Sequence, residues 1–187
     1  MEMQTLTTTR LEIQPQSIGH SDRLFELFQD EALYPFIFTT PPKSKDEFRE
    51  RIRFLEGRKS RDGLAYWINW VSLHRETGEL IGQVEVTLQI ESRELYLAYY
   101  VFRKHWRQGY AKESCKAVIA HMFEAWGATK VIIEMDVRNT ASFRLAESLG
   151  ATRVAFTPKA QLLKGEWSDE YRYEIKSGAL DPKGSSS

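Results

Sequence analysis

A short stretch of basic and small residues, His105 to Glu113, has the composition of an anion-binding turn. It follows an apolar, strand-like run from Leu95 to Phe102 and opens a helix-like run from Tyr110 to Trp126. The first N–H groups of a helix lack partners inside the helix and lie at the positive end of its dipole. Such a turn can therefore hold a phosphate or a pyrophosphate.

The residues expected to contact such an anion are Arg107, Gln108, Gly109, Tyr110, Ala111 and Lys112. Gly109 lets a ligand approach the backbone closely, and Arg107 and Lys112 add positive charge. The turn lacks the Gly-Lys-Ser/Thr of a P-loop and two of the three glycines of a dinucleotide-binding fingerprint. On spacing alone, a helix start in which Gly109 only makes a turn is the simpler interpretation.

A second strand-to-helix junction lies at Val137 to Ser142. Asn139 and Ser142 are three residues apart at the start of a predicted helix that Gly150 ends. Their side chains can cap that helix with no ligand present, and the same side chains can contact a ligand. Both interpretations stay open on the spacing.

Composition excludes several classes of function. The chain has 187 residues, 42% of them hydrophobic, which fits one globular domain over residues 1–176; the small, polar residues 177–187 are expected to be a disordered tail. Lysine plus arginine equals aspartate plus glutamate at 26 each, which argues against nucleic acid as a partner. One cysteine and four scattered histidines predict no metal site. With no long apolar run and no signal peptide, we expect a cytoplasmic protein that contacts no membrane.

Hydrophobic periodicity predicts one alternating α/β domain. The predicted strands lie around residues 11–13, 64–73, 80–90, 95–102, 130–138, 154–156 and 169–175, and the predicted helices around 24–28, 44–55, 110–126 and 140–149. Ser21 or Asp22 is expected to cap the first helix, and Ser44 with Glu47 matches a capping box at the second. A loop is expected over residues 158–167. Cys115 lies on the apolar stripe of the third helix, which predicts a buried, inert thiol.

The two junctions together resemble those of the GCN5-related N-acetyltransferase (GNAT) superfamily, in particular its branch of ribosomal-protein N-terminal acetyltransferases. The resemblance spans about Arg10 to Ile175. Its motifs are Arg10-Leu11, Thr77 to Gly82, Ala98 to Val101, Trp106 to Ala111, Asn139 with Ser142, and Gly165 to Asp169 with Tyr173. The resemblance implies a single-domain α/β fold with a mixed, mostly antiparallel sheet, splayed central parallel strands and flanking helices.

The resemblance also implies that acetyl-CoA is a co-substrate. It would bind in a gap between the strands 95–102 and 131–138, with its pyrophosphate in the glycine turn. Its pantetheine amides would lie against the backbone of Tyr100 to Arg103, which includes Val101, Phe102 and Arg103. Asn139 would reach the cofactor arm. Ser142 would lie near the thioester sulfur and protonate the departing thiolate.

The implied reaction is direct attack of a primary amine, from a protein N-terminus or a small molecule, on the thioester carbonyl in a ternary complex. It needs a route for the amine proton, a hydrogen-bond donor to the carbonyl and a proton for the sulfur. A backbone N–H near Val101 is the expected donor.

Two side chains are further catalytic candidates. Glu85, on the polar side of its strand, would act as the base directly or through water, and a solvated strand carboxylate is the alternative. Tyr96 and Tyr99 lie on opposite faces of one strand, so at most one faces a given cleft. Tyr96 is included among the catalytic candidates, with buried packing as its alternative role.

One departure from the resembled branch opens a second hypothesis. Where that branch carries a Glu-Gly pair, this chain has Val154 and Ala155. The missing carboxylate weakens a ribosomal-protein N-terminus as acceptor and motivates a non-catalytic acyl-CoA-binding or regulatory module. A nucleotide-binding α/β protein is a third hypothesis. The acceptor would lie between the loop 34–42, the start of the second helix and the loop 158–167. A homodimer is an open alternative, because dimers are common in the branch.

Overall fold

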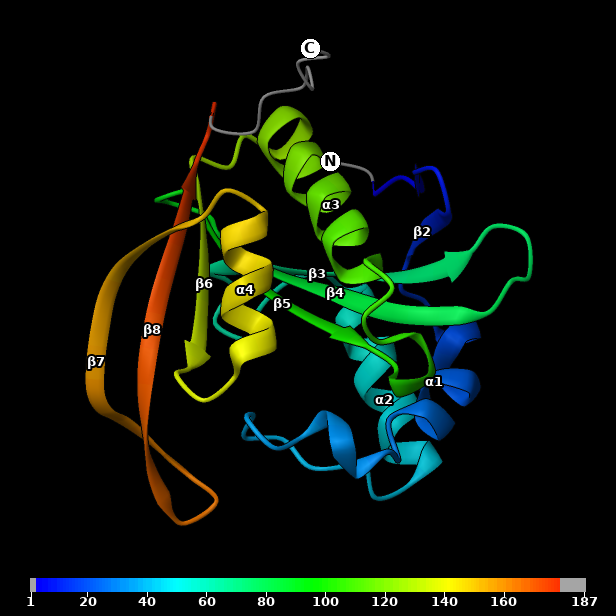
Figure 1. Ribbon diagram of the computed structural model, residues 1–187. Coiled ribbons are helices and arrows are strands. Elements are labelled where there is room, and N and C mark those ends of the chain that lie inside the picture. The colour runs from blue at the N-terminus through cyan, green and yellow to red at the C-terminus, as the bar shows by residue number, and fades with distance from the viewer. Residues whose placement is uncertain (1–2, 179–187) are drawn as a thin grey trace.

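One mixed sheet of eight strands organises the protein. The computed structural model describes residues 3–178, so most of the predicted disordered tail lies outside the described residues. The strand order is β1-β2-β3-β4-β5-β6-β8-β7, and β5–β6 is the one parallel pair among the described strands (Figure 1). The predicted fold class, a single α/β domain with a mostly antiparallel sheet, is confirmed.

The strands are β1 (Leu6–Thr7), β2 (Leu11–Pro15), β3 (Ala65–His74), β4 (Leu80–Gln89), β5 (Glu94–Val101), β6 (Lys130–Asp136), β7 (Thr152–Leu163) and β8 (Glu166–Lys176). The helices are α1 (Ser21–Leu27), α2 (Lys45–Glu56), α3 (Tyr110–Trp126) and α4 (Thr140–Ser148), with short 3-10 turns at Ile18–His20, Glu31–Leu33 and Arg103–His105. None of the helices within residues 3–178 is long and apolar enough to cross a membrane.

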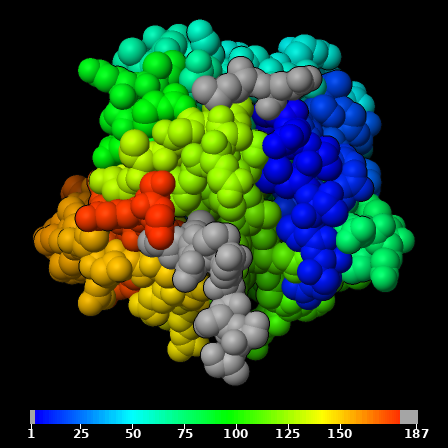
Figure 2. All heavy atoms as spheres, turned by 90° about the horizontal axis from the view of Figure 1, so that it is seen from above, coloured from blue at the N-terminus to red at the C-terminus, as the bar shows by residue number. Residues whose placement is uncertain are grey.

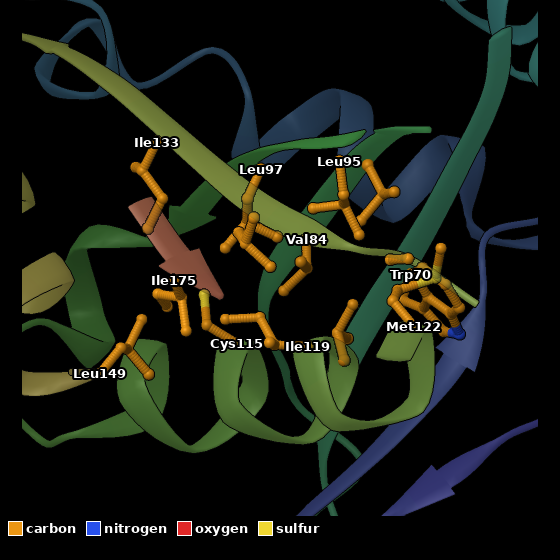
Figure 3. Packing of buried hydrophobic residues seen from close by; sticks show 14 of the residues in the cluster. Trp70, Val84, Leu95, Leu97, Cys115, Ile119, Met122, Ile133, Leu149 and Ile175 are labelled. Carbon is orange, nitrogen blue, oxygen red and sulfur yellow. The ribbon is translucent and has the colours of Figure 1, made fainter. Parts of the chain in front are cut away.

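Helix α3 packs along one face of the sheet and forms the larger part of the core. Its predicted apolar stripe is buried, and Cys115, Ile119 and Met122 have no exposed surface. In Figure 3 these side chains point toward Val84 and Leu95 on the strands. A second, smaller core lies between α1, α2 and the opposite face of the sheet. The sheet therefore separates two differently covered faces.

The parallel strands β5 and β6 separate along their length, as the family resemblance predicted. They pair through Glu94–Lys130, Leu95–Val131 and Tyr96–Ile132. Beyond Tyr96 the register ends, although β5 continues to Val101 and β6 to Asp136. The edge of β5 from residue 97 onward is therefore not paired with β6, and this opening is the gap.

The predicted loop over residues 158–167 is wrong, because β7 and β8 form a long hairpin through this region. Lys164 and Gly165 both have positive φ angles, 52° and 89°, which are typical of a two-residue hairpin turn. Pro158 suggested a loop, but β7 is an edge strand, where proline is tolerated.

The predicted cap of the first helix is also wrong. Ser21 is the first residue of α1 rather than its cap, and His20 precedes it without a side-chain cap. The chain enters the helix from the 3-10 turn Ile18–His20, which replaces the capping function. At α2 the prediction is confirmed, since the Ser44 side chain accepts from the Glu47 N–H.

Candidate active site

The gap exposes one edge of β5. Phe102 donates its N–H to Ile81 O on β4 at 2.9 Å. Because the peptide groups of a strand alternate between its two edges, those of Val101 and Tyr99 face the gap. Trp106 Nε1 donates to Val101 O at 2.6 Å, which fixes the indole at the end of the strand. The Val101 N–H thus points to the opening, where the sequence interpretation requires a donor.

Phe102 and Arg103 contribute less to the gap than predicted. The Phe102 side chain is 2% exposed and belongs to the smaller core. Its N–H is used by Ile81, and its carbonyl accepts from His105 N at 2.8 Å. Arg103 is exposed, 4.0 Å from Asp30. The peptide groups of β5 that face the gap are therefore those of Tyr99 and Val101 rather than those of Phe102 and Arg103.

The glycine turn joins the end of β5 to the start of α3 (Figure 1). Within the part of the chain described here, no carbonyl or side chain accepts from the backbone N–H groups of residues 107 to 112. Arg107 and Gly109 have φ angles of 59° and 81°. Left-handed residues alternating with right-handed ones make a concave array of N–H groups. Arg107 and Lys112 are both exposed and make no ion pair among residues 3–178. The turn therefore combines unpartnered N–H groups with two exposed cations, which are the features that favour a bound anion.

The first strands support this turn through Arg10, a role that sequence reasoning missed. Arg10 Nη1 donates to Gln108 O at 2.9 Å, and its guanidinium lies 4.2 Å from the centre of the Tyr110 ring. Arg10 Nε and Glu113 Oε2 are 2.7 Å apart. Figure 2 shows the N-terminal strands, in blue, lying alongside α3, in green. The contact is long-range, so no local pattern in the sequence indicates it.

Asn139 and Ser142 lie together at the start of α4, beside the gap. Asn139 Oδ1 accepts from Ser142 N at 3.1 Å, which confirms the predicted cap. Asn139 Nδ2 has no partner within the described chain and remains free for a ligand. Ser142 Oγ is 2.7 Å from the Tyr99 hydroxyl, which also donates to Ser142 O at 3.2 Å. Tyr99 therefore links β5 to α4 across the gap.

Tyr99, rather than Tyr96, is the tyrosine that meets Ser142. The two lie on opposite faces of β5, as predicted, and Tyr96 instead lies near Arg172 of β8, 6.0 Å from ring centre to guanidinium. Burial raises the pKa of Tyr99 well above its usual range, so its hydroxyl stays protonated and able to donate. Burial likewise raises the pKa of Cys115 to about 12, which agrees with the predicted inert thiol.

A pocket of about 220 Å³ opens on the other face of the sheet. The predicted base, Glu85, lines it from β4, and Tyr100 lines it from β5. Glu85 is paired in register with Ala98 of β5, the strand that borders the gap, and Ala98 is exposed on the same face of the sheet. Gln83 Nε2 donates to Glu85 Oε1 at 2.6 Å. Burial nevertheless raises the pKa of Glu85, the change a general base needs.

The pocket lies close to the predicted acceptor site. Residues of the 34–42 loop and of α2 line it. The β7–β8 hairpin does not line it, but Lys164 Nζ donates to Tyr34 O at 2.5 Å and so joins the hairpin to its rim. The gap thus lies along one edge of β5, and the pocket lies on one face of the sheet beside the same strand.

Comparison with known proteins decides the family. The family model described as the acetyltransferase (GNAT) domain matches residues 10–152, more than half of the chain. The protein belongs to this family. The matched segment contains the gap, the glycine turn and the start of α4. The predicted enzyme class, an acetyl-CoA-dependent acetyltransferase, is confirmed.

Three proteins match this GNAT protein over more than nine tenths of its length. The uncharacterized N-acetyltransferase p20 of Bacillus licheniformis is 24% identical over 179 residues, which are 92% of this chain and 96% of p20. RimL, a ribosomal alpha-N-protein acetyltransferase solved with coenzyme A, superposes with a TM-score of 0.85 at 19% identity, covering 94% and 99% of the two chains. Spermidine N-acetyltransferase from Vibrio cholerae superposes with a TM-score of 0.80 at 18% identity, covering 93% of this chain and 100% of its own. The predicted likeness to the ribosomal-protein branch is confirmed at the level of the fold.

Asp136 supports the start of α4 in this GNAT protein, and it is 1% exposed. It accepts from Arg138 Nη2 at 2.7 Å and from Ser168 Oγ at 2.7 Å, and its carbonyl accepts from Asn139 N at 2.9 Å. The Arg138 hydrogen bonds hold the pKa of Asp136 at about 2, below its usual 3.8. A carboxyl group whose pKa is lower in the folded protein stabilises the fold at every pH above its unfolded pKa. This contribution to stability is lost as the pH falls from about 4 to 2.

Asp136→Asn is therefore expected to lower the free energy of unfolding at pH 7 by about 2 kcal/mol. Urea denaturation at pH 7 and at pH 2 measures this free energy. The difference between variant and wild type should be smaller at pH 2. Equal unfolding free energies at pH 7 would show that the carboxylate does not stabilise the turn.

No cluster of three or more potential metal ligands occurs among residues 3–178.

Proposed function

We propose that this enzyme transfers the acetyl group of acetyl-CoA directly to a primary amine in a ternary complex. One observation carries the proposal: the glycine turn, the open edge of β5 and the Glu85 pocket converge on a single strand from different sides. A donor bound along the gap and an acceptor bound in the pocket would meet beside Ala98 and Tyr99. Direct attack needs this geometry and no covalent enzyme intermediate.

The turn would hold the pyrophosphate of acetyl-CoA through the N–H groups of residues 107–112, with Arg107 and Lys112 adding charge. The pantetheine amides would pair with the gap-facing peptide groups of β5, as a further strand would. Asn139 Nδ2 would donate to the same arm. These roles fit because the N–H groups of the turn and Asn139 Nδ2 have no hydrogen-bond partner among residues 3–178.

In the chemical step, the acceptor enters as an ammonium and loses a proton to Glu85, directly or through water. The neutral nitrogen attacks the thioester carbonyl, whose oxygen accepts from the Val101 N–H. The C–N bond forms and the nitrogen gives its second proton to water. The C–S bond breaks, and the sulfur takes a proton from Ser142, which recovers one from solvent through Tyr99. The products are an N-acetyl amide and free CoA.

Tyr99→Phe tests the proton donor. The phenylalanine ring keeps the packing but cannot hold Ser142 Oγ, so kcat is expected to fall about tenfold with little change in the KM for acetyl-CoA. Steady-state kinetics of Tyr99→Phe, Ser142→Ala and the double variant measure this. The double variant should lose little more than Ser142→Ala alone, because the two hydroxyls act as a unit. Unchanged turnover in Ser142→Ala would mean that Ser142 only caps α4.

The test of the proposed function is an acceptor panel of amino acids, polyamines, simple amines and peptides, followed by free-thiol release from acetyl-CoA. Thiol release should depend on the acceptor, with the acetylated amine found by mass spectrometry. The alternative is the non-catalytic acyl-CoA-binding module, motivated by Val154 and Ala155 in place of Glu-Gly. Tight CoA binding with no acceptor-dependent thiol release across the panel would favour that module.

A further inference from the structure

The charges of helix α2 single out one arginine. The helix carries four cations, and Lys45, Arg49 and Arg53 each form an ion pair, with Glu26, Asp22 and Glu50. Arg51 forms no ion pair or hydrogen bond with any residue from 3 to 178. Glu47, four residues earlier and also on the pocket wall, makes no ion pair with it either. Arg51 is thus the cation of α2 that has no ion-pair partner among residues 3–178, whereas each of the other three has one.

Arg51 lines the pocket that contains Glu85. Arg51 from α2 and Glu85 from β4 form no ion pair with each other, so the pocket lining offers both a cation and an anion. Lys43 and Glu47 at the mouth are exposed and balance each other in charge. The rest of the lining includes four aromatic side chains, Phe28, Tyr34, Phe48 and Tyr100, beside aliphatic and uncharged polar ones. A ligand that complements this pocket has both charges and an apolar body.

We propose that the acceptor carries a carboxylate beside its amine, and that Arg51 binds this carboxylate while Glu85 takes the proton of the ammonium. The proposal rests on the proposed function and names the substrate class of that same pocket: free amino acids with apolar side chains. A guanidinium binds a carboxylate through two parallel hydrogen bonds, so Arg51 would also orient the amine toward the gap. A diamine or polyamine would instead bring a second cation toward Arg51, which disfavours it.

Two matched pairs of acceptors test the substrate class. Phenylalanine and 2-phenylethylamine differ only by the carboxylate, as do leucine and 3-methylbutylamine. The wild-type kcat/KM should favour each amino acid over its partner by about tenfold or more, the usual effect of a charged hydrogen bond. Phenylalaninamide, which imitates a peptide N-terminus, should resemble 2-phenylethylamine. No preference in either pair, or an amide as good as the amino acid, would overturn the proposal.

Variants assign the preference to Arg51. Arg51→Gln should lose about tenfold more on the amino acids than on the carboxylate-free amines, and Arg51→Lys should recover part of that difference. Arg49→Gln, on the same helix but paired with Asp22, is the matched control and should keep the preference. An equal loss on both kinds of acceptor in Arg51→Gln would indicate a structural role and overturn the assignment.

A binding measurement separates this inference from the proposed function. Calorimetry measures the binding of phenylalanine and of 2-phenylethylamine to protein loaded with CoA, which has no acetyl group to transfer. Wild type should bind phenylalanine about tenfold more tightly, and Arg51→Gln should bind both equally. If acetyl transfer fails with every amine but this difference persists, the proposed function is wrong and the carboxylate site stands. If transfer occurs and the difference is absent, the carboxylate site is wrong.

Discussion

Gly109→Glu will abolish CoA binding while the fold survives. Gly109 is exposed at the centre of the glycine turn, and a Cβ added there meets only Arg10 Nη2, at 3.5 Å. The glutamate would place a carboxylate among the free N–H groups and repel the pyrophosphate. We expect the dissociation constant for CoA to rise by more than about 100-fold, as measured by calorimetry, because several charge-assisted hydrogen bonds are lost together.

Gly109→Ala is the matched control. Both substitutions force a side chain onto a φ angle of 81°, at a cost of about 1–2 kcal/mol in the backbone. They therefore share the strain and differ in the charge. Alanine should weaken CoA binding far less than glutamate, and both variants should keep the wild-type circular dichroism spectrum. Tight CoA binding by Gly109→Glu would place the pyrophosphate elsewhere.

Glu85→Gln will lower kcat by about 100-fold or more, because a general base contributes on this scale. Glutamine keeps the shape of the side chain and the hydrogen bond from Gln83 but cannot take a proton. Burial raises the pKa of Glu85 above its ordinary 4.5, so kcat of the wild type should fall as the pH drops through this raised pKa. The variant should show no such acid limb. A variant with wild-type kcat, or with the same acid limb, would exclude Glu85 as the base.

The same substitution should stabilise the fold. A carboxyl whose pKa is higher in the folded protein binds its proton more tightly there, so its contribution to stability is full at low pH. That contribution is lost as the pH rises through the folded pKa. At pH 7 the buried charge of Glu85 costs stability, and glutamine removes that cost. We expect a higher Tm for Glu85→Gln at pH 7 and convergence with wild type below pH 4. A lower Tm at pH 7 would contradict the burial of this charge.

Local signals in the sequence predicted the elements that surround the site. The apolar stripe of α3, the glycine before it and the Asn139 cap each depend on residues a few positions apart, which periodicity and capping rules can detect. Glu85 was placed on its face by strand alternation. The gap between β5 and β6 has no local signal, and the family resemblance alone supplied it.

The missed features are long-range contacts. Arg10 meets Gln108, and Tyr99 meets Ser142, across the fold rather than along the chain. The family resemblance implied that the backbone of Phe102 faces the gap, but the alternation of peptide groups turns its N–H toward β4. Arg51 is one of four cations on α2, and only the ion pairs of the other three distinguish it. Pairing of this kind depends on tertiary structure, so spacing could not indicate it.

A crystal structure of the protein with CoA tests the central claim most directly. We expect the pyrophosphate on the N–H groups of residues 107–112, the pantetheine arm along the open edge of β5, and the thiol beside Ser142 and Val101. CoA bound with its pyrophosphate away from the glycine turn, or with its thiol outside the gap between β5 and β6, would contradict the account.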